Sequence, residues 1–282
     1  MTKYNKLLIF IKSTIFNLIG SPYIIRLLNL KNKKGEIFTN KYDSFYQAKE
    51  KEDKNYWNSI YWQNKRIKNL NRIIKENNKN NFITLNDTDS SCYGLISFLI
   101  SLLNNEDKII EILDYGGSNG IDYFRTKNSI KNINYNWSVY DKIKLTKNEL
   151  ELIDQKNNKN LFFIDKLNHN NKFDIILSSS VFQYVNEYEK LLKEFFLFKP
   201  KYIFFMRFWC LDSEKDLYTT EVQNNQAIII ISYKKFNSIL QKNGYKLLFK
   251  GPCSVKNNIA LANININNNL FGDSNLIYKR II

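Results

Sequence analysis

Short apolar runs alternate with amphipathic segments along the chain from residue 108 onward. The apolar runs each suit one strand and read "KIIEILDYG", "YNWSVYD", "NLFFID", "KFDIILSSS" and "KYIFFMRFW". Between several of them lie segments with helical spacing, at 118–131, 143–157 and 186–198. Continuous apolar strands separated by such segments are typical of a parallel sheet that helices cover on both faces. Farther on, the pattern predicts a helix from 232, a turn at Asn243-Gly244, and strands up to 251 and over 274–282.

The N-terminal part of the chain carries mainly helical patterns. Residues 1–30 suit one or two helices, with Gly20 and Pro22 at the break between them. Residues 41–78 also show helical spacing, and the apolar stretch 86–105 begins with Asp and Ser residues that can cap a helix. These patterns predict an N-terminal helical extension or cap over 1–104 and a main α/β domain over 105–282.

The predicted first helix is amphipathic. Its apolar face comprises Leu7, Leu8, Ile11, Ile15, Leu18 and Ile19. Polar residues interrupt the run, no small-residue cleavage site follows it, and it is too short and too polar to span a bilayer. We therefore expect a cytoplasmic protein. Its first helix either docks on its own domain, the interpretation that we favour, or makes peripheral contact with the inner face of the membrane through residues 1–30.

Positive charge exceeds negative charge in the chain, with 42 Lys and Arg against 27 Asp and Glu and a formal net charge of +15. Such a charge attracts nucleic acid, anionic lipid or a phosphate-bearing substrate. Lysine and asparagine are nevertheless spread along the whole chain, whereas a nucleic-acid footprint gathers on one face or element. We favour a compositional cause, typical of an AT-rich genome, and do not expect a nucleic-acid partner.

The cysteines, acids and histidine give no sign of a metal site or a disulfide framework. Cys92, Cys210 and Cys253 lie far apart in the sequence, and no C-x-x-C pair occurs. No cluster of acids and histidines has the spacing of metal ligands. These observations favour a reducing compartment and predict no bound metal.

Glycines are concentrated in the stretch "EILDYGGSNGIDYF", which holds Gly116, Gly117 and Gly120 out of 9 glycines in the chain. A strand that ends in an acid and leads through a glycine-rich turn into a helix lets the backbone approach a ligand closely. A dinucleotide fingerprint, G-x-G-x-x-G, fails because Ile121 or Asp122 stands at the third glycine position. A phosphate-binding P-loop fails because no G-K-[ST] follows.

The spacing Asp114-x-Gly116-x-Ser118-x-Gly120 does resemble the first motif of class I S-adenosylmethionine-dependent methyltransferases, acid-x-Gly-x-Gly-x-Gly. Asp141 ends the second predicted strand about 20 residues beyond the last glycine, where a carboxylate can accept both hydroxyls of a ribose. The stretch 173–207 is similar to the family's fourth strand, loop, helix and fifth strand. The resemblance therefore spans 111–207.

This resemblance implies a seven-stranded, mostly parallel, Rossmann-like α/β fold and S-adenosylmethionine as the cofactor. In this family the glycines let the backbone approach the methionine moiety, the first acid organises its ammonium group, and the second acid holds the ribose. A group after the third strand often reads the adenine amine. The implied cofactor-binding residues are Asp114, Gly116, Gly117, Ser118, Gly120, Asp141, Asp165 and Ser179.

A narrower group within this family is also similar to the chain. The doubled glycine of "LDYGGSNG", the W-x-V before Asp141 and the segment "SSSVFQYV" resemble bacterial methyltransferases encoded among surface-polysaccharide genes, those of capsule or O-antigen. This resemblance implies methyl transfer to a hydroxyl or phosphate-linked group of a surface-glycan precursor. The chain departs from that group at Asp141, where Glu is usual, and at Ser118, where Gly is commoner.

Methyl transfer is an in-line displacement that depends on alignment, and a hydroxyl acceptor also needs a proton acceptor. The single histidine, His169, lies in a loop that leads to the wrong end of the sheet, so we interpret it as a surface residue. Arg207 would grip a phosphate or carboxylate of the acceptor, or close the domain through a salt bridge. The candidates for catalysis, all expected near the carboxyl ends of strands, are Tyr123, Gln183, Tyr184, Arg207 and Asp212.

Two other functions compete with this one. An RNA or DNA methyltransferase would use the positive charge and the aromatic residues of 45–62, which we expect mainly to pack in the core. The fourth-strand loop reads "SSSVFQY", however, and lacks the N-P-P-[YF] or D-P-P-Y signature by which many such enzymes hold a base. The second alternative is a methyltransferase-like adaptor that has lost catalysis.

Overall fold

The computed structural model of the protein describes residues 38–79, 87–104, 108–153, 157–221, 225–253 and 270–281. The predicted first helix, within 1–30, lies outside these residues, and so does its expected contact with the domain or with a membrane. Among the described residues, no helix is both long and apolar enough to cross a membrane.

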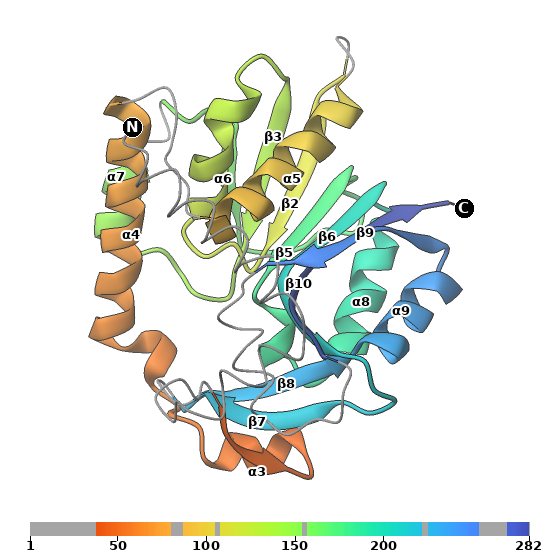
Figure 1. Ribbon diagram of the computed structural model, residues 1–282. Coiled ribbons are helices and arrows are strands. Elements are labelled where there is room, and N and C mark those ends of the chain that lie inside the picture. Colours follow the sequence, from red (N-terminus) through yellow and green to blue (C-terminus); the bar gives the residue numbers. More distant parts are fainter. Residues whose placement is uncertain are drawn as a thin grey trace, which may run out of the picture.

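Seven strands form a sheet in which all but one run in parallel (Figure 1). The parallel strands, in spatial order, are β4 (Leu161–Ile164), β3 (Tyr135–Tyr140), β2 (Ile110–Tyr115), β5 (Ile175–Ser179) and β6 (Tyr202–Leu211). Beyond β6 come the reversed strand β10 (Leu270–Arg280) and then β9 (Tyr245–Pro252), which pairs only with β10. The structure thus confirms the predicted Rossmann-like, mostly parallel sheet of class I methyltransferase type.

Two hydrophobic cores lie on opposite faces of this sheet because successive side chains of a strand point to opposite faces. On β2, Ile112 joins one core and Leu113 the other. The first core is covered by α4 (Ile60–Lys79), α5 (Asp87–Leu103), α6 (Ile121–Thr126) and α7 (Lys147–Ile153). The second is covered by α8 (Tyr188–Leu197) and α9 (Tyr233–Lys242). Burial on both faces explains why the central strands read as continuous apolar runs.

Three further strands extend the sheet, and the sequence pattern did not indicate them. The carboxyl end of β6 pairs in parallel with β8 (Ala227–Ser232), which pairs with β7 (Leu217–Glu221), which in turn pairs with β1 (Phe38–Tyr42). The short helix α3 (Phe45–Glu50) packs against β7 and β8 (Figure 1). The N-terminal extension therefore contributes a strand as well as helices.

The extension also shares its core with the main sheet. Cys92, Tyr93, Ile96 and Leu99 of α5 are buried in the same cluster as the side chains of β2 and β3. The boundary at 104 and 105 accordingly remains a division drawn from the sequence pattern.

Candidate cofactor site

The glycine turn after β2 has a shape that side chains would prevent. Gly116 and Gly120 have φ values of +75° and +72°, which L-residues rarely adopt. A Cβ atom on Gly116 would lie 2.3 Å from Cγ2 of Val181, in the segment after β5. A Cβ atom on Gly117 would lie 2.4 Å from Cγ of Asp114. The glycines therefore let the turn fold over the Asp114 carboxylate and pack against the end of the neighbouring strand.

Ser118, where the family more often has glycine, also takes a left-handed conformation, with a φ of 55°. For a residue with a Cβ atom this conformation costs about 1–2 kcal/mol. The departure from the usual motif therefore leaves the shape of the turn intact at a cost in stability.

Asp114 lies under this turn, and one of its carboxylate oxygens has no partner. Its side chain is 0% exposed, and the indole Nε1 of Trp137 donates to Oδ2 at 3.1 Å. Oδ1 is buried without a hydrogen-bond partner. Burial, and then the nearby charge of Asp122, raise the pKa of the Asp114 carboxyl well above its ordinary value. A buried acceptor of this kind fits a cationic hydrogen-bond donor such as the ammonium group of S-adenosylmethionine.

Asp141, the residue after β3, contacts the glycine turn directly. Its Oδ2 accepts a hydrogen bond from the backbone N–H of Ser118 at 2.8 Å, and its Oδ1 accepts one from Ile143 at 2.9 Å. The structure thus brings the second predicted acid to the turn. These bonds shape the two loops, and the binding of a ribose by Asp141 stays a prediction.

The other predicted cofactor residues lie at the same edge of the sheet. Ser179 is the last residue of β5 and is half-buried, and Asp165 directly follows β4 and is exposed. Because β4, β3, β2 and β5 are parallel neighbours, their carboxyl ends form one continuous edge (Figure 1). Ligands of open α/β sheets bind outside this edge.

Gln183 and Tyr184 lie in a short 3-10 helix, η4 (Phe182–Tyr184), which follows the segment that touches Gly116. The amide oxygen of Gln183 is buried and has no hydrogen-bond partner. The Tyr184 hydroxyl donates to Oε1 of Glu221 at 3.2 Å. Burial, and then the charge of Glu221, raise the pKa of Tyr184 well above its ordinary value. Tyr184 therefore stays protonated at neutral pH and acts as a hydrogen-bond donor.

Aromatic residues of the N-terminal extension pack against η4. Trp57 contacts Tyr56, Trp62 and Tyr184, with ring centroids 5.0–5.2 Å apart and interplanar angles of 77–85°. These edge-to-face contacts are the geometry that aromatic pairs prefer. The extension thus reaches the carboxyl edge beside the glycine turn, and part of the predicted aromatic set packs there.

Arg207 belongs to a buried polar network that links β6 to α5 and α6. Its Nη2 donates to the hydroxyl of Tyr93 at 2.9 Å, and that hydroxyl donates to Oδ1 of Asp122 at 2.7 Å. Arg125 also donates to the Tyr93 hydroxyl. Arg207 thus links β6 to α5 through Tyr93, and both of its predicted roles, binding of the acceptor and a salt bridge that closes the domain, stay predictions. The sequence analysis did not single out Tyr93, Asp122 or Arg125. The available signal was the pair of charged residues, Asp122 and Arg125, in α6, most of which is buried.

Two residues from the sequence analysis lie away from the edge. Tyr123 is 4% exposed and packs in the core against Phe124, Tyr135 and Trp137, with Tyr135 at the beginning of β3. The structure therefore does not bring Tyr123 to the carboxyl ends. His169 is exposed and lies 5.4 Å, between ring centroids, from Phe198, which precedes β6. That places it near the amino ends of the strands, as its loop predicted.

Two cysteines that are distant in the sequence meet in the core. The Sγ atoms of Cys92 and Cys253 are 3.2 Å apart, and all three cysteines are free thiols. The spacing in the sequence could not indicate this contact. No group of three or more His, Cys, Asp or Glu residues within the described part of the chain could hold a metal ion.

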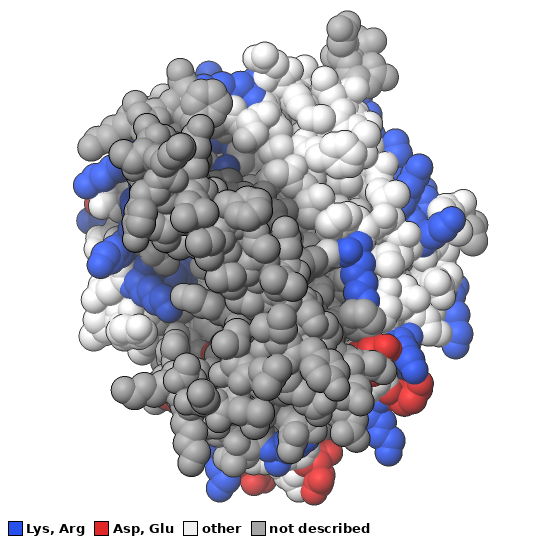
Figure 2. Space-filling model, in the orientation of Figure 1, with Lys and Arg blue, Asp and Glu red and all other residues white. Residues whose placement is uncertain are grey.

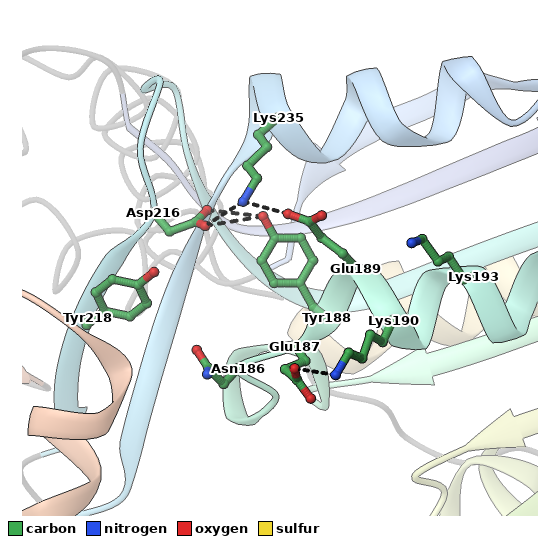
Figure 3. Close-up of a pocket in the computed structure, with 9 residues that line it drawn as sticks. All are labelled: Asn186, Glu187, Tyr188, Glu189, Lys190, Lys193, Asp216, Tyr218 and Lys235. Carbon is green, nitrogen blue, oxygen red and sulfur yellow. Dashed lines mark hydrogen bonds and ion pairs between the residues drawn. The ribbon is translucent and has the colours of Figure 1, made fainter.

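A pocket of about 320 Å³ lies beside α8 and α9 (Figure 3). Two of its three lysines pair with carboxylates: Lys235 is 2.7 Å from Oε1 of Glu189 and 3.5 Å from Oδ2 of Asp216, and Lys190 pairs with Glu187 at 2.5 Å. Asp216 also accepts a hydrogen bond from the Tyr188 hydroxyl. These ion pairs neutralise the pocket, which belongs to the α8 and α9 side of the sheet and not to the glycine turn.

Figure 2 shows Lys and Arg side chains around the margin of the visible face, beside acidic ones at its lower right.

No family model and no curated protein matches the chain. Solved structures do resemble it. A 1,6-didemethyltoxoflavin-N1-methyltransferase of Burkholderia thailandensis has 10% identity and a TM-score of 0.49, over 70% of this chain and 79% of the other. A magnesium protoporphyrin IX methyltransferase of Synechocystis has 12% identity and a TM-score of 0.46, over 85% of this chain and 100% of the other. A sarcosine dimethylglycine methyltransferase described for Galdieria sulphuraria has 10% identity and a TM-score of 0.44, over 68% of this chain and 84% of the other. Likenesses of this size do not define an activity, and the fold rests on the strand order above.

Proposed function

We propose that the protein is an S-adenosylmethionine-dependent methyltransferase that acts on a hydroxyl or phosphate-linked group of a surface-glycan precursor. The observation that carries the cofactor part is the unpartnered Oδ1 of Asp114 under the glycine turn. The acceptor part rests on the resemblance to enzymes of surface-polysaccharide gene clusters.

Three parts of the carboxyl edge bind three different parts of the cofactor. Asp114 holds the ammonium group, Asp141 takes the ribose hydroxyls, and the backbone of the glycine turn lines the methionine moiety. The sulfonium supplies an activated methyl group. With that group in place, the main task left to the protein's own residues would be to align the acceptor oxygen with the methyl group.

The acceptor has its best-supported place beside η4. The unpartnered amide oxygen of Gln183 can accept a hydrogen bond from an acceptor hydroxyl and so orient it. Tyr184 is held protonated, so it does not remove the proton. A hydroxyl acceptor oriented by Gln183 therefore needs another proton acceptor, whereas an ionised phosphate oxygen needs none.

The first experiment is a calorimetric titration of S-adenosylmethionine and S-adenosylhomocysteine into wild type and Asp141→Ala. We expect wild type to bind and Asp141→Ala to bind at least about tenfold more weakly, since hydrogen bonds to a charged group contribute about 1.5–3 kcal/mol. Asp174→Ala is the matched control. Asp174 also accepts a backbone N–H, from Glu111 at 3.1 Å, but lies at the opposite edge of the sheet.

The expected result is that the control variant binds like wild type. No binding by wild type would overturn the proposal and favour the non-catalytic adaptor.

Transfer of radiolabelled methyl groups to nucleotide-sugars or lipid-linked glycans then tests the acceptor. Labelling of RNA alone would replace the glycan with nucleic acid. Binding to anionic vesicles that is lost on deletion of residues 1–30 would establish the membrane contact.

A further inference from the structure

A buried carboxylate outside the predicted cofactor set joins the two loops of the cofactor site. Glu149 lies in the first turn of α7 and is 0% exposed. Its Oε2 accepts hydrogen bonds from the backbone N–H of Thr146 at 2.9 Å and from the Thr146 hydroxyl at 3.0 Å. Thr146 in turn accepts from the backbone N–H of Glu149. This reciprocal arrangement is a capping box, which begins many helices and is usually local.

In this protein the capping-box carboxylate makes two further contacts at long range. Nδ2 of Asn119 donates to its Oε1 at 3.0 Å, and Nη2 of Arg66 lies 2.9 Å from the same oxygen. Asn119 belongs to the glycine turn, between Ser118 and Gly120, and is 2% exposed. Arg66 comes from α4, is 5% exposed, and accepts a second hydrogen bond from Asn119 at its backbone oxygen. A helix cap alone would need none of these contacts.

The contacts of Glu149 lie next to the groups that are proposed to bind the cofactor. Ser118, adjacent to Asn119, donates its backbone N–H to Asp141. The loop that Asp141 begins then leads to Thr146. Side-chain hydrogen bonds therefore connect the glycine turn to the loop after β3 twice, once through Asp141 and once through Glu149. Each of these connections is a tie between the two loops. The second tie fixes the distance between the loops without using the atoms that would face the ribose.

Helix α4 takes part in this tie from outside the sheet. It packs along α6 and α7, which follow the two loops (Figure 1). Arg66 supplies the positive charge that a fully buried Glu149 requires, since an uncompensated buried carboxylate is strongly unfavourable. The N-terminal extension thereby acts on the position of both loops.

We propose that Glu149, held by Arg66, is a positioning residue for S-adenosylmethionine and sets the glycine turn and the Asp141 loop at the separation that the cofactor needs. The inference rests on the proposed function, because it assigns the ligand of the two loops. It adds to that function a specific way in which the N-terminal extension controls cofactor affinity.

Asn119→Ala is the sharpest test because it cuts the tie and leaves the Arg66–Glu149 ion pair in place. In titrations with S-adenosylhomocysteine we expect affinity to fall about ten- to hundredfold, as displaced binding groups commonly cause. Asn158→Ala is the matched control. Asn158 is also buried, at 6% exposure, and its amide donates to the Ile153 backbone oxygen at 2.7 Å, away from both loops. We expect that variant to lower the melting temperature and leave the affinity unchanged.

A double-mutant cycle separates positioning from general destabilisation. Because both ties act on the same two loops, the loss in Asn119→Ala/Asp141→Ala should be smaller than the product of the two single losses. Losses that multiply, or an affinity for Asn119→Ala equal to that of wild type, would overturn the inference while the proposed function stands. Absence of binding by wild type would overturn the proposed function itself. If Asn119→Ala does not fold, Arg66→Met/Glu149→Met removes both buried charges and the oxygen that accepts from Asn119, and it is expected to show the same loss of affinity.

Discussion

The chemistry of the site is decided at the residue scale by Asp114. Its carboxyl group is fully buried, has one donor in Trp137 and has a free acceptor atom in Oδ1. Burial makes the ionised form unfavourable until a cation arrives, so ligand charge and protonation of this residue are coupled. No other buried acid of the described carboxyl edge combines these features.

This coupling predicts how cofactor affinity depends on pH. The folded-state pKa of Asp114 is raised, so the residue stabilises the free protein at low pH, and this contribution is lost as pH rises through that pKa. An ammonium group favours the ionised form instead. Affinity for S-adenosylhomocysteine should therefore rise with pH, from the ordinary range of an aspartate up to the raised pKa, with release of a proton. Calorimetry in buffers of different ionisation enthalpy measures that release.

The Asp114→Asn variant provides the comparison. It keeps the shape of the side chain and an oxygen for Trp137, but it cannot ionise. We expect affinity to fall about ten- to hundredfold, the worth of one charge-assisted hydrogen bond. Its remaining affinity should show no pH dependence in this range. A proton release equal to that of wild type would assign the titration to another group.

At the scale of elements, the turn between β2 and α6 and the segment after β5 form one packed unit. Gly116 touches Val181, and η4, with Gln183 and Tyr184, begins directly beyond that contact. The aromatic residues around Trp57 then connect η4 to the start of α4. A change in the glycine turn therefore reaches the place proposed for the acceptor.

Paired glycine substitutions test this unit. In Gly116→Ala the new Cβ atom would lie 2.3 Å from Val181, at a φ of +75°, so we expect destabilisation of about 1–3 kcal/mol and weak cofactor binding. Gly94→Ala is the control within α5, where a Cβ atom meets nothing within 4 Å. It should stabilise the protein by about 0.5–1 kcal/mol. Denaturant unfolding measures both, and equal stability of the two variants would contradict the tight packing.

At the scale of the whole molecule, distant parts of the chain converge on one edge of the sheet. The N-terminal part contributes β1 to the extension of the sheet and α4 to the tie at Glu149. The region after β6 contributes β7 and β8. These segments share one sheet and its cores, so a ligand bound at the glycine turn should stabilise the molecule as a unit.

Thermal unfolding measures that effect. At a free concentration of one hundred times Kd, S-adenosylhomocysteine should add about 2.7 kcal/mol of stability, which corresponds to a rise in Tm of about 5–10 °C in a protein of this size. NAD is the control ligand, since the glycine spacing does not fit a dinucleotide. A larger shift with NAD than with S-adenosylhomocysteine would overturn the assignment of the ligand.

The sequence by itself determined the central parallel strands and the glycine turn because both depend on local properties of the chain. Continuous apolar runs mark strands buried on both faces, and the helical segments between them require parallel connections. That order alone places Asp114, Asp141, Asp165 and Ser179 at one edge. The glycines are needed for a backbone conformation and a close approach, both of which act over a few residues.

Only the tertiary structure decided which side chains meet. The pairing of β1 with β7 joins residues far apart in the chain through backbone hydrogen bonds, which leave little mark on sequence pattern. Tyr123 and Arg207 turn toward buried partners because packing sets their direction, and Cys92 meets Cys253 for the same reason. The tie of Glu149 to Asn119 and Arg66 depends on three elements that are placed by the cores. Such contacts are long-range, and periodicity carries no information about them.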